Sequence, residues 1–367
     1  MRFTNQSGLA AGWTLGFERD GRERLVIAVK ATYRLPADRE EPRLHEEPVD
    51  LVTADLYTGE PGLSATLHES DYAHVKPGCD VLLLGSAWAP RGRPTSRVGV
   101  RLQVGKMDKS FAVTGPRRWR YAWGSVSAGD PEPMLRQAIS YDVAFGGTHE
   151  DPRTSEKSRM CDLNPVGRGF TLDSRTLDNA WMPFTEEIGR PITGARNDWR
   201  PMAFGPIGRH WMPRRTWAGT YDDAWSRQRA PFWPDDFDER YFQAAPPDQV
   251  IAHPQGGEPV VLQNLTPDGL RRFHLPRRTM PVTFISYRGR DATRLAALDT
   301  IAFEPDAERF MLTWRATLAL PGSVFDVQEV VVGEMPPAWH RARRFPGKAY
   351  YPSLKELVAT RRRTGRL

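Results

Sequence analysis

The sequence predicts a mainly β protein whose antiparallel sheets form a sandwich-like fold, with a long ordered, loop-rich central region and a C-terminal helix. Short segments rich in β-branched residues, several of them alternating apolar and polar side chains, occur near both ends of the 367-residue chain. The 31 Gly and 32 Pro follow no period, which indicates many turns between short strands. Apolar residues make up 40% and charged residues 26%, as is typical of a packed globular protein.

Residues 1–150 are predicted to form the first β-rich part. Segment 24–35 is rich in β-branched residues and ends before Pro36, and segment 79–88 follows a Lys-Pro-Gly turn. Segment 97–104 alternates cleanly between apolar and polar side chains, and 109–114 is predicted to return beside it as a hairpin. One apolar and one polar face are typical of an antiparallel sheet packed on one side.

Residues 151–250 are predicted to form the loop-rich central region. Five of the twelve tryptophans lie between Trp199 and Trp233, in a stretch dense in Pro, Gly and charged residues. A disordered linker would not carry so many large aromatic side chains, because their exposure to water is unfavourable. We therefore expect ordered loops fixed by aromatic side chains, with a short helix near 238–245.

Strands return in the third part, residues 251–337, and a basic tail with a short helix occupies residues 338–367. The predicted strands are 258–265, 270–275, 280–287 and 310–320, and Ser353 with Glu356 forms a capping box for a helix over 354–363. Segment 30–36 (KATYRLP) is similar to 315–321 (RATLALP). Either a strand was duplicated or two buried strands match by chance, and the order of the neighbouring strands does not repeat.

The positive charge of the chain is concentrated in its tail. The net charge is +6, yet residues 340–367 contain nine Lys or Arg and one Glu, so the remainder sums to −2. A sequence-reading nucleic-acid binder carries its basic surface on the folded domain, so no specific nucleic-acid partner is expected. Cys79 and Cys161 lack zinc-ligand spacing, and neither a signal peptide nor an apolar run of about 18 residues is visible. We expect a cytoplasmic protein without a membrane partner.

No catalytic, cofactor or metal site is predicted. Residues 68–74 (HESDYAH) contain two His, a Glu and an Asp, residue types that suit a metal or acid–base chemistry, but on a strand these side chains would alternate between two faces. The alternative is a polar connection. Six carboxylates in 222–239 offer a glycosidase-like pair or, alternatively, partners for nearby arginines.

Several long segments, in the same order, resemble a bacterial family catalogued as domain of unknown function 2169, over about residues 1–320. The resemblance implies an adaptor or chaperone that binds a type VI secretion effector, commonly one with a PAAR tip, and helps to load it onto the VgrG spike. The segments are DLYTGEPG (55–62), ESDYAHVKPGCDVLLLG (69–85), SYDVAFGG (140–147), NPVGRGF (164–170), FGPIGRHWMPR (204–214), GTYDDAW (219–225), DDFDERYFQAAPPDQ (235–249), GGEPVVLQNLTPDG (256–269) and LDTIAFEPDAERFMLTWRA (298–316).

Such a protein needs a surface for its partner rather than a reaction centre. Interface hot spots favour Trp, Tyr and Arg, which gather in the central region. The alternatives are a carbohydrate- or peptidoglycan-active enzyme, which needs two carboxylates facing each other across an aromatic-lined cleft, or a structural component of the secretion apparatus. The candidate partner-binding residues are Trp199, Arg209, Trp211, Arg214, Trp217, Tyr221 and Trp225.

Overall fold

A six-stranded sheet forms the centre of the protein. The computed structural model describes residues 1–151, 154–287, 290–345, 349–351 and 354–363. The strand order of this sheet is β18-β6-β23-β24-β3-β2, and only the β6–β23 pair is parallel. Its strands are β2 (Ala10–Phe17), β3 (Glu23–Arg34), β6 (Cys79–Leu83), β18 (Val250–Ile251), β23 (Ala297–Glu304) and β24 (Arg309–Ala319).

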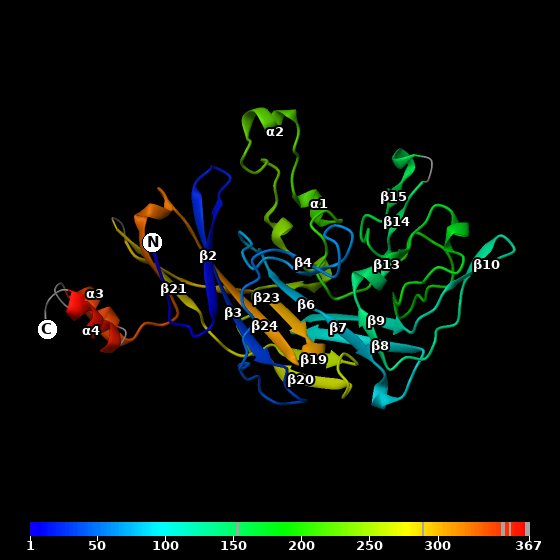
Figure 1. Cartoon of the computed structure of the whole chain (residues 1–367), viewed down its shortest axis with the longest axis horizontal. Helices are drawn as coiled ribbons and strands as arrows, with labels where there is room; N and C mark the ends of the chain where they lie inside the picture. Colours follow the sequence, from blue (N-terminus) through cyan, green and yellow to red (C-terminus); the bar gives the residue numbers. More distant parts are fainter. Residues whose placement is uncertain (152–153, 288–289, 346–348, 352–353, 364–367) are drawn as a thin grey trace.

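Two further sheets complete the β framework. An antiparallel sheet of order β17-β9-β8-β19-β20 lies beside the central sheet, and a four-stranded sheet of order β1-β25-β21-β22 lies toward the C-terminal end (Figure 1). The first contains β8 (Arg97–Val104), β9 (Met107–Thr114), β17 (Thr185–Glu186), β19 (Pro259–Gln263) and β20 (Leu270–His274). The second contains β1 (Arg2–Asn5), β21 (Pro281–Ser286), β22 (Ala292–Leu295) and β25 (Val327–Val332).

The remaining elements are short. Five two-stranded pairs are formed by β4 (Leu56–Tyr57) with β5 (Thr66–His68), β7 (Gly85–Trp88) with β12 (Arg136–Ile139), β10 (Trp119–Ala122) with β11 (Ser125–Ala128), β13 (Phe145–Gly146) with β16 (Arg168–Gly169), and β14 (Thr148–His149) with β15 (Arg159–Met160). The α-helices are α1 (Arg214–Trp217), α2 (Asp223–Gln228), α3 (Pro337–Arg344) and α4 (Leu354–Arg363). Single 3-10 turns lie at Pro90–Gly92, Tyr141–Val143, Ser155–Lys157, Ser174–Leu177, Glu239–Phe242, Pro247–Gln249, Pro305–Ala307 and Val324–Asp326.

One large core joins the three sheets. Its buried side chains come from β3, β8, β9, β19, β21, β24 and β25, and include Ile27, Leu102 and Val330. A smaller core, formed by residues of the first part and of the central region, contains Trp119 and Trp199. Because β3 pairs with β24 over eleven residues, the first and third parts of the sequence share one sheet and do not fold around separate cores.

The prediction of a mainly β, antiparallel fold is confirmed. The hairpin of β8 and β9 occurs as expected, and the helix predicted over 354–363 is α4; the proposed cap Ser353 lies outside the described residues. Segment 79–88 divides into β6 and β7 because its chain leaves the central sheet after Leu83 and pairs with β12 instead. The expected helix near 238–245 is a single 3-10 turn over Glu239–Phe242.

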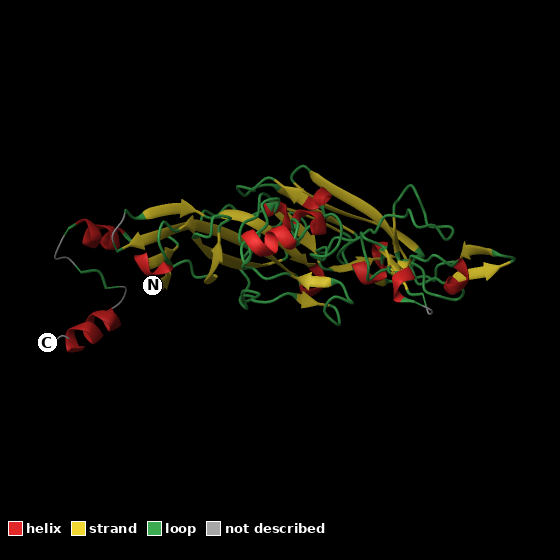
Figure 2. Cartoon of the chain, turned by 90° about the horizontal axis from the view of Figure 1, so that it is seen from above, coloured by secondary structure: helices red, strands yellow, loops and turns green. Residues whose placement is uncertain are grey.

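The molecule is elongated when seen from above (Figure 2). Helices α3 and α4 lie at one end and the β10–β11 hairpin at the other, while the segment that carries α2 rises from the middle (Figures 1 and 2). No helix within the described ranges has the length and apolar character needed to cross a membrane.

Candidate functional site

The candidate site lies beside a projecting arm, residues 213–238, which carries α1 and α2 (Figure 1). Asp222 accepts a hydrogen bond from the backbone N–H of Trp225 at 2.8 Å and so caps α2. The Trp225 indole N–H in turn donates to the carbonyl of Phe232 at 2.9 Å, which joins the two sides of the arm. Asp236 accepts from the backbone and hydroxyl of Thr220 at 2.9 and 2.7 Å. The arm is therefore an ordered element, held by its own polar side chains.

A fully buried arginine fixes the base of the arm. Arg214 has no exposed surface, and its guanidinium donates two hydrogen bonds to the carboxylate of Glu69. The bond from Nη2 to Oε2 measures 3.0 Å. Its other N–H groups donate to the carbonyls of Tyr241, at 2.8 and 3.1 Å, and of Ile207, at 2.7 Å. A bidentate pair gives geometric specificity, so these contacts set the direction in which the arm leaves the body.

The segment 68–74 binds the arm to the central sheet. His68 lies 2.8 Å from Glu304, Glu69 pairs with Arg214, and Asp71 pairs with Lys30 on β3. Arg309, on β24, also bonds to Glu304 at 2.6 Å. The polar residues of this segment are thus used in connections between elements, which is the structural alternative that the sequence left open.

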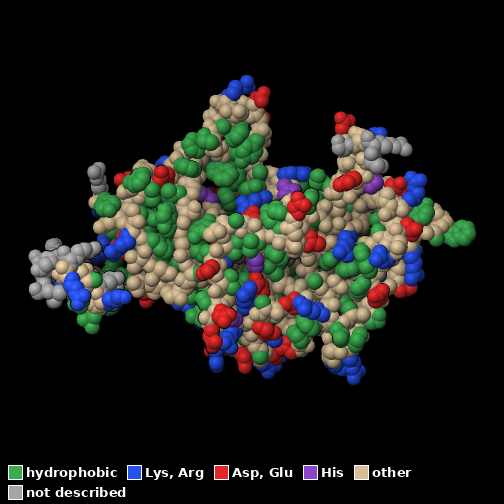
Figure 3. Space-filling model, viewed as in Figure 1, with side chains coloured by type: hydrophobic (Ala, Val, Ile, Leu, Met, Phe, Trp, Pro, Cys, Tyr) green, Lys and Arg blue, Asp and Glu red, His purple; other side chains and the backbone are tan. Residues whose placement is uncertain are grey.

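An apolar groove of about 530 Å³ lies between β2 and the arm, and we call it the β2–arm groove. Figure 3 shows hydrophobic side chains gathered at the foot of the arm and over the neighbouring strands. None of its lining residues is an Asp, Glu, Lys or Arg. The lining residues are Thr14, Leu15, Gly16, Phe17, Val26, Tyr72, His74, Tyr221, Pro231, Phe232, Trp233 and Phe242.

Aromatic contacts form the walls of the groove. Phe17 packs edge-on against Phe232 with ring centroids 6.1 Å apart, and the Trp233 indole N–H donates to the carbonyl of Phe17 at 3.2 Å. Tyr221 packs edge-on against Trp225 at 4.7 Å. About half of the surface of Phe17 (51%) and of Tyr221 (52%) remains exposed, so both rings present apolar area to a partner.

His74 contributes an uncharged ring to this lining. Burial and, after it, the positive charge of Arg24 lower the pKa of His74 to about 4. Its ring lies 5.9 Å from that of Phe242. A Cβ atom on Gly16 would lie 2.5 Å from His74 Nδ1, and one on Gly12 would lie 2.1 Å from the Tyr72 hydroxyl. The two glycines of β2 therefore allow segment 72–74 to pack directly on the strand.

The structure separates the seven candidate partner-binding residues. Trp199 and Trp211 are 6% and 1% exposed and belong to the two cores, and Arg214 is buried at the base of the arm. These three side chains do not reach the surface, because intrachain packing uses them. Arg209 is partly exposed and pairs with Asp55 at 3.1 Å.

Trp217, Tyr221 and Trp225 belong to the arm. The Arg240 guanidinium lies 4.9 Å from the centre of the Trp217 ring. Tyr221 is the one predicted residue that lines the groove. Sequence reasoning missed Phe17 and Phe232; the alternation of Trp13, Leu15 and Phe17 was the available signal for the strand that carries Phe17.

Four carboxylates of the arm are engaged in local structure: Asp222, Asp235, Asp236 and Asp238. Hydrogen bonds from Thr220 lower the pKa of Asp236, and hydrogen bonds from Arg240 lower that of Asp238. Asp235 pairs with Arg229 at 3.1 Å. A general acid needs the opposite shift, a raised pKa. Among the described residues, no group of three or more His, Cys, Asp or Glu is placed to hold a metal ion.

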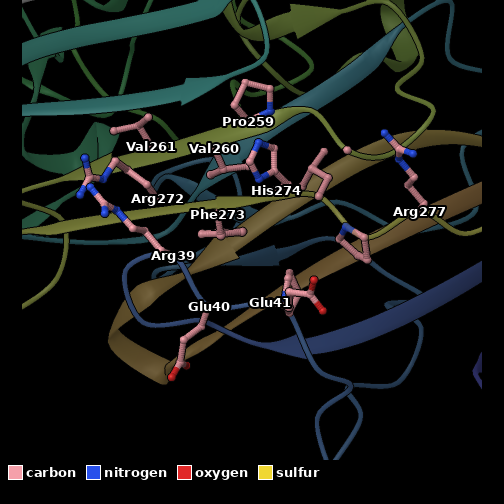
Figure 4. A pocket seen from close by; sticks show the side chains of 14 residues that line it. Arg39, Glu40, Glu41, Pro259, Val260, Val261, Arg272, Phe273, His274 and Arg277 are labelled. Carbon is pink, nitrogen blue, oxygen red and sulfur yellow. The ribbon is translucent and has the colours of Figure 1, made fainter.

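A second hollow, of about 890 Å³, lies against the outer side of β19 and β20 (Figure 4). It has mixed charge: Arg39 and Arg272 extend from one side of it, and Glu40 and Glu41 lie below. Arg272 forms two hydrogen bonds with Asp38, at 2.9 and 2.6 Å. The β2–arm groove differs in having an uncharged lining and in containing a residue of the predicted surface.

Fold and site together define a mainly β protein with an apolar groove between an edge strand and an ordered arm. The family model described as an uncharacterized protein conserved in bacteria (DUF2169) matches residues 20–315. The chain belongs to this family. The comparisons of this chain with curated proteins and with solved structures found no match.

Proposed function

We propose that this chain is a non-enzymatic adaptor or chaperone that binds a type VI secretion effector, one bearing a PAAR domain, and helps to load it onto the VgrG spike. The uncharged β2–arm groove, with the half-exposed rings of Phe17 and Tyr221, carries the part of the proposal that concerns binding. The secretion role rests on the family resemblance of the sequence. The proposed role also implies a cytoplasmic location, because effectors are loaded before they leave the cell.

The groove has the features that protein interfaces use. Aromatic side chains bury a large area at a low cost in conformational entropy, and hot spots are rich in Trp and Tyr. The arm is anchored at its base by Arg214, so the groove is preformed and its binding would lose little to ordering. The engaged arm carboxylates also favour binding over the alternative of a carbohydrate-active enzyme.

The test is co-purification of the tagged chain with the effector encoded beside it, followed by a delivery assay in a deletion strain. Tyr221→Ala with Phe17→Ala should weaken the complex at least tenfold, since about 1.4 kcal/mol corresponds to a decade in affinity. Trp123→Ala is the matched control: Trp123 is fully exposed in the β10–β11 hairpin, outside the groove. Normal delivery without this chain, together with no recoverable complex, would exclude the adaptor role.

A further inference from the structure

The central sheet ends at a strand whose outer edge is free. β2 is the last strand in the order β18-β6-β23-β24-β3-β2, and it pairs only with β3. The backbone N–H of Glu18 donates to the carbonyl of Arg22, so this pair and every second pair along the hairpin exchange hydrogen bonds. The intervening residues Ala11, Trp13, Leu15 and Phe17 therefore direct their N–H and C=O groups away from β3.

Most of this edge carries no backbone partner within the described residues. The Phe17 carbonyl accepts from the Trp233 indole, which closes the edge at the arm. From Ala11 to Leu15, no hydrogen bond to an outward backbone group occurs in the part of the chain that the structure describes. Unpaired edge groups of this kind are a template for another strand.

The side chains at two of these positions lie on the core face of the sheet but remain partly exposed, because no strand follows β2. Trp13 lies opposite Ile27, and Leu15 lies opposite Leu25, so they share the face that β3 gives to the large core. Ile27 and Leu25 have no exposed surface, whereas Trp13 is 42% and Leu15 37% exposed. One more strand beside β2 would place its own alternate side chains on this face and cover the exposed ones.

The surroundings restrict the chemistry of that strand. The adjoining groove lining has no charged residue, and His74 within it is neutral. A charged side chain entering there would lose hydration without gaining a partner. The occupant that matches is an extended, uncharged segment with apolar residues at alternate positions.

We propose that β2 binds an extended segment of a partner protein by strand addition, with backbone hydrogen bonds at Ala11, Trp13 and Leu15 and apolar side chains directed toward the groove and the core face. This deepens and rests on the proposed adaptor function, since it states what part of an effector the groove takes. Strand addition draws affinity from the backbone and specificity from alternate side chains.

The experiment pans phage-displayed random decapeptides against the whole chain, so that it does not depend on any effector. Selected peptides should show alternating apolar residues without charges at those positions. Leu15→Pro should weaken their binding at least tenfold, and more than Leu15→Ala, because proline removes an outward N–H that β3 does not use. Leu15→Lys, which preserves every backbone group, should also block binding by placing a charge on the edge.

Amide exchange supplies a second readout that side-chain docking would not give. On peptide binding, exchange should slow at Ala11, Trp13 and Leu15 and stay unchanged at Gly12 and Thr14, whose N–H groups already pair with β3. The inference is overturned if selected peptides lack alternation, if Leu15→Pro equals Leu15→Ala in a folded protein, or if light scattering shows a dimer of the chain that Leu15→Pro dissociates. If the effector fails to bind while the selected peptides do bind, the adaptor function is wrong and strand addition at β2 is still supported.

Discussion

Replacing Arg214 by methionine should destabilise the protein strongly without touching an exposed surface. The substitution leaves the Glu69 carboxylate, which is 9% exposed, with Arg209 at 3.4 Å as its remaining charged partner. It also removes the donors to the carbonyls of Tyr241 and Ile207. Breaking a buried ion pair from one side costs about 3–5 kcal/mol, because the other charge stays buried.

The assay is urea unfolding at pH 7.5, followed by circular dichroism and by amide exchange across the arm. The free energy of unfolding should fall by about 3–5 kcal/mol, and exchange within residues 213–238 should accelerate. Arg215→Ala is the matched control. Arg215 is the next residue in the chain, its side chain is half exposed, and its pair with Asp162 lies at the surface, so the loss should stay within about 0.5 kcal/mol.

A double variant separates the ion pair from simple packing. Adding Glu69→Leu to Arg214→Met removes the unpaired carboxylate, and at least half of the lost stability should return. The account of the arm fails if Arg214→Met costs less than about 1 kcal/mol, or if the two substitutions are additive.

Three further outcomes follow from the structure and the charge distribution. His74 has a folded pKa of about 4, below its unfolded value near 6.5, so its contribution is complete above pH 6.5 and is lost as the pH falls toward 4; urea midpoints should show a smaller acid loss for His74→Asn than for the wild type. Trp211→Ala should cost about 3–5 kcal/mol in the same unfolding assay, whereas Trp123→Ala should leave stability nearly unchanged. Deleting residues 340–367 should abolish any DNA binding in a gel-shift series at increasing salt, because those residues hold more than the whole net charge; tight binding by the truncated chain at about 0.2 M salt would refute this.

Period-2 alternation made the β8–β9 hairpin predictable from the sequence, and β-branched content made β3 predictable. β2 was not predicted, since two glycines among its eight residues lower strand propensity. Glycine is required at these two positions because Tyr72 and His74, which are distant in sequence, approach the strand closely. Such long-range packing leaves no local signal.

Residue type alone could not separate interface from core in the central region. Trp211 packs in the main core and Tyr221 is half exposed on the arm, yet both are aromatic residues among turn-forming neighbours. Arg214 suited an interface by composition, but a carboxylate 145 positions away makes it a buried anchor. The sequence therefore located the region of the candidate groove, and only the fold identified the strand on its other side.

The pairing of β3 with β24 has a consequence for the synthesis of the chain. β3 ends at Arg34, whereas β24, its long neighbour in the sheet, begins only at Arg309, so β3 leaves the ribosome well before β24. At about 5–20 residues per second, the apolar strand stays unpaired on that side for on the order of ten seconds or more. Contacts between such distant segments also close slowly. Of the two strands that pair with β3, β2 precedes it in the chain, so the β2–β3 hairpin can cover one edge of β3 during this interval.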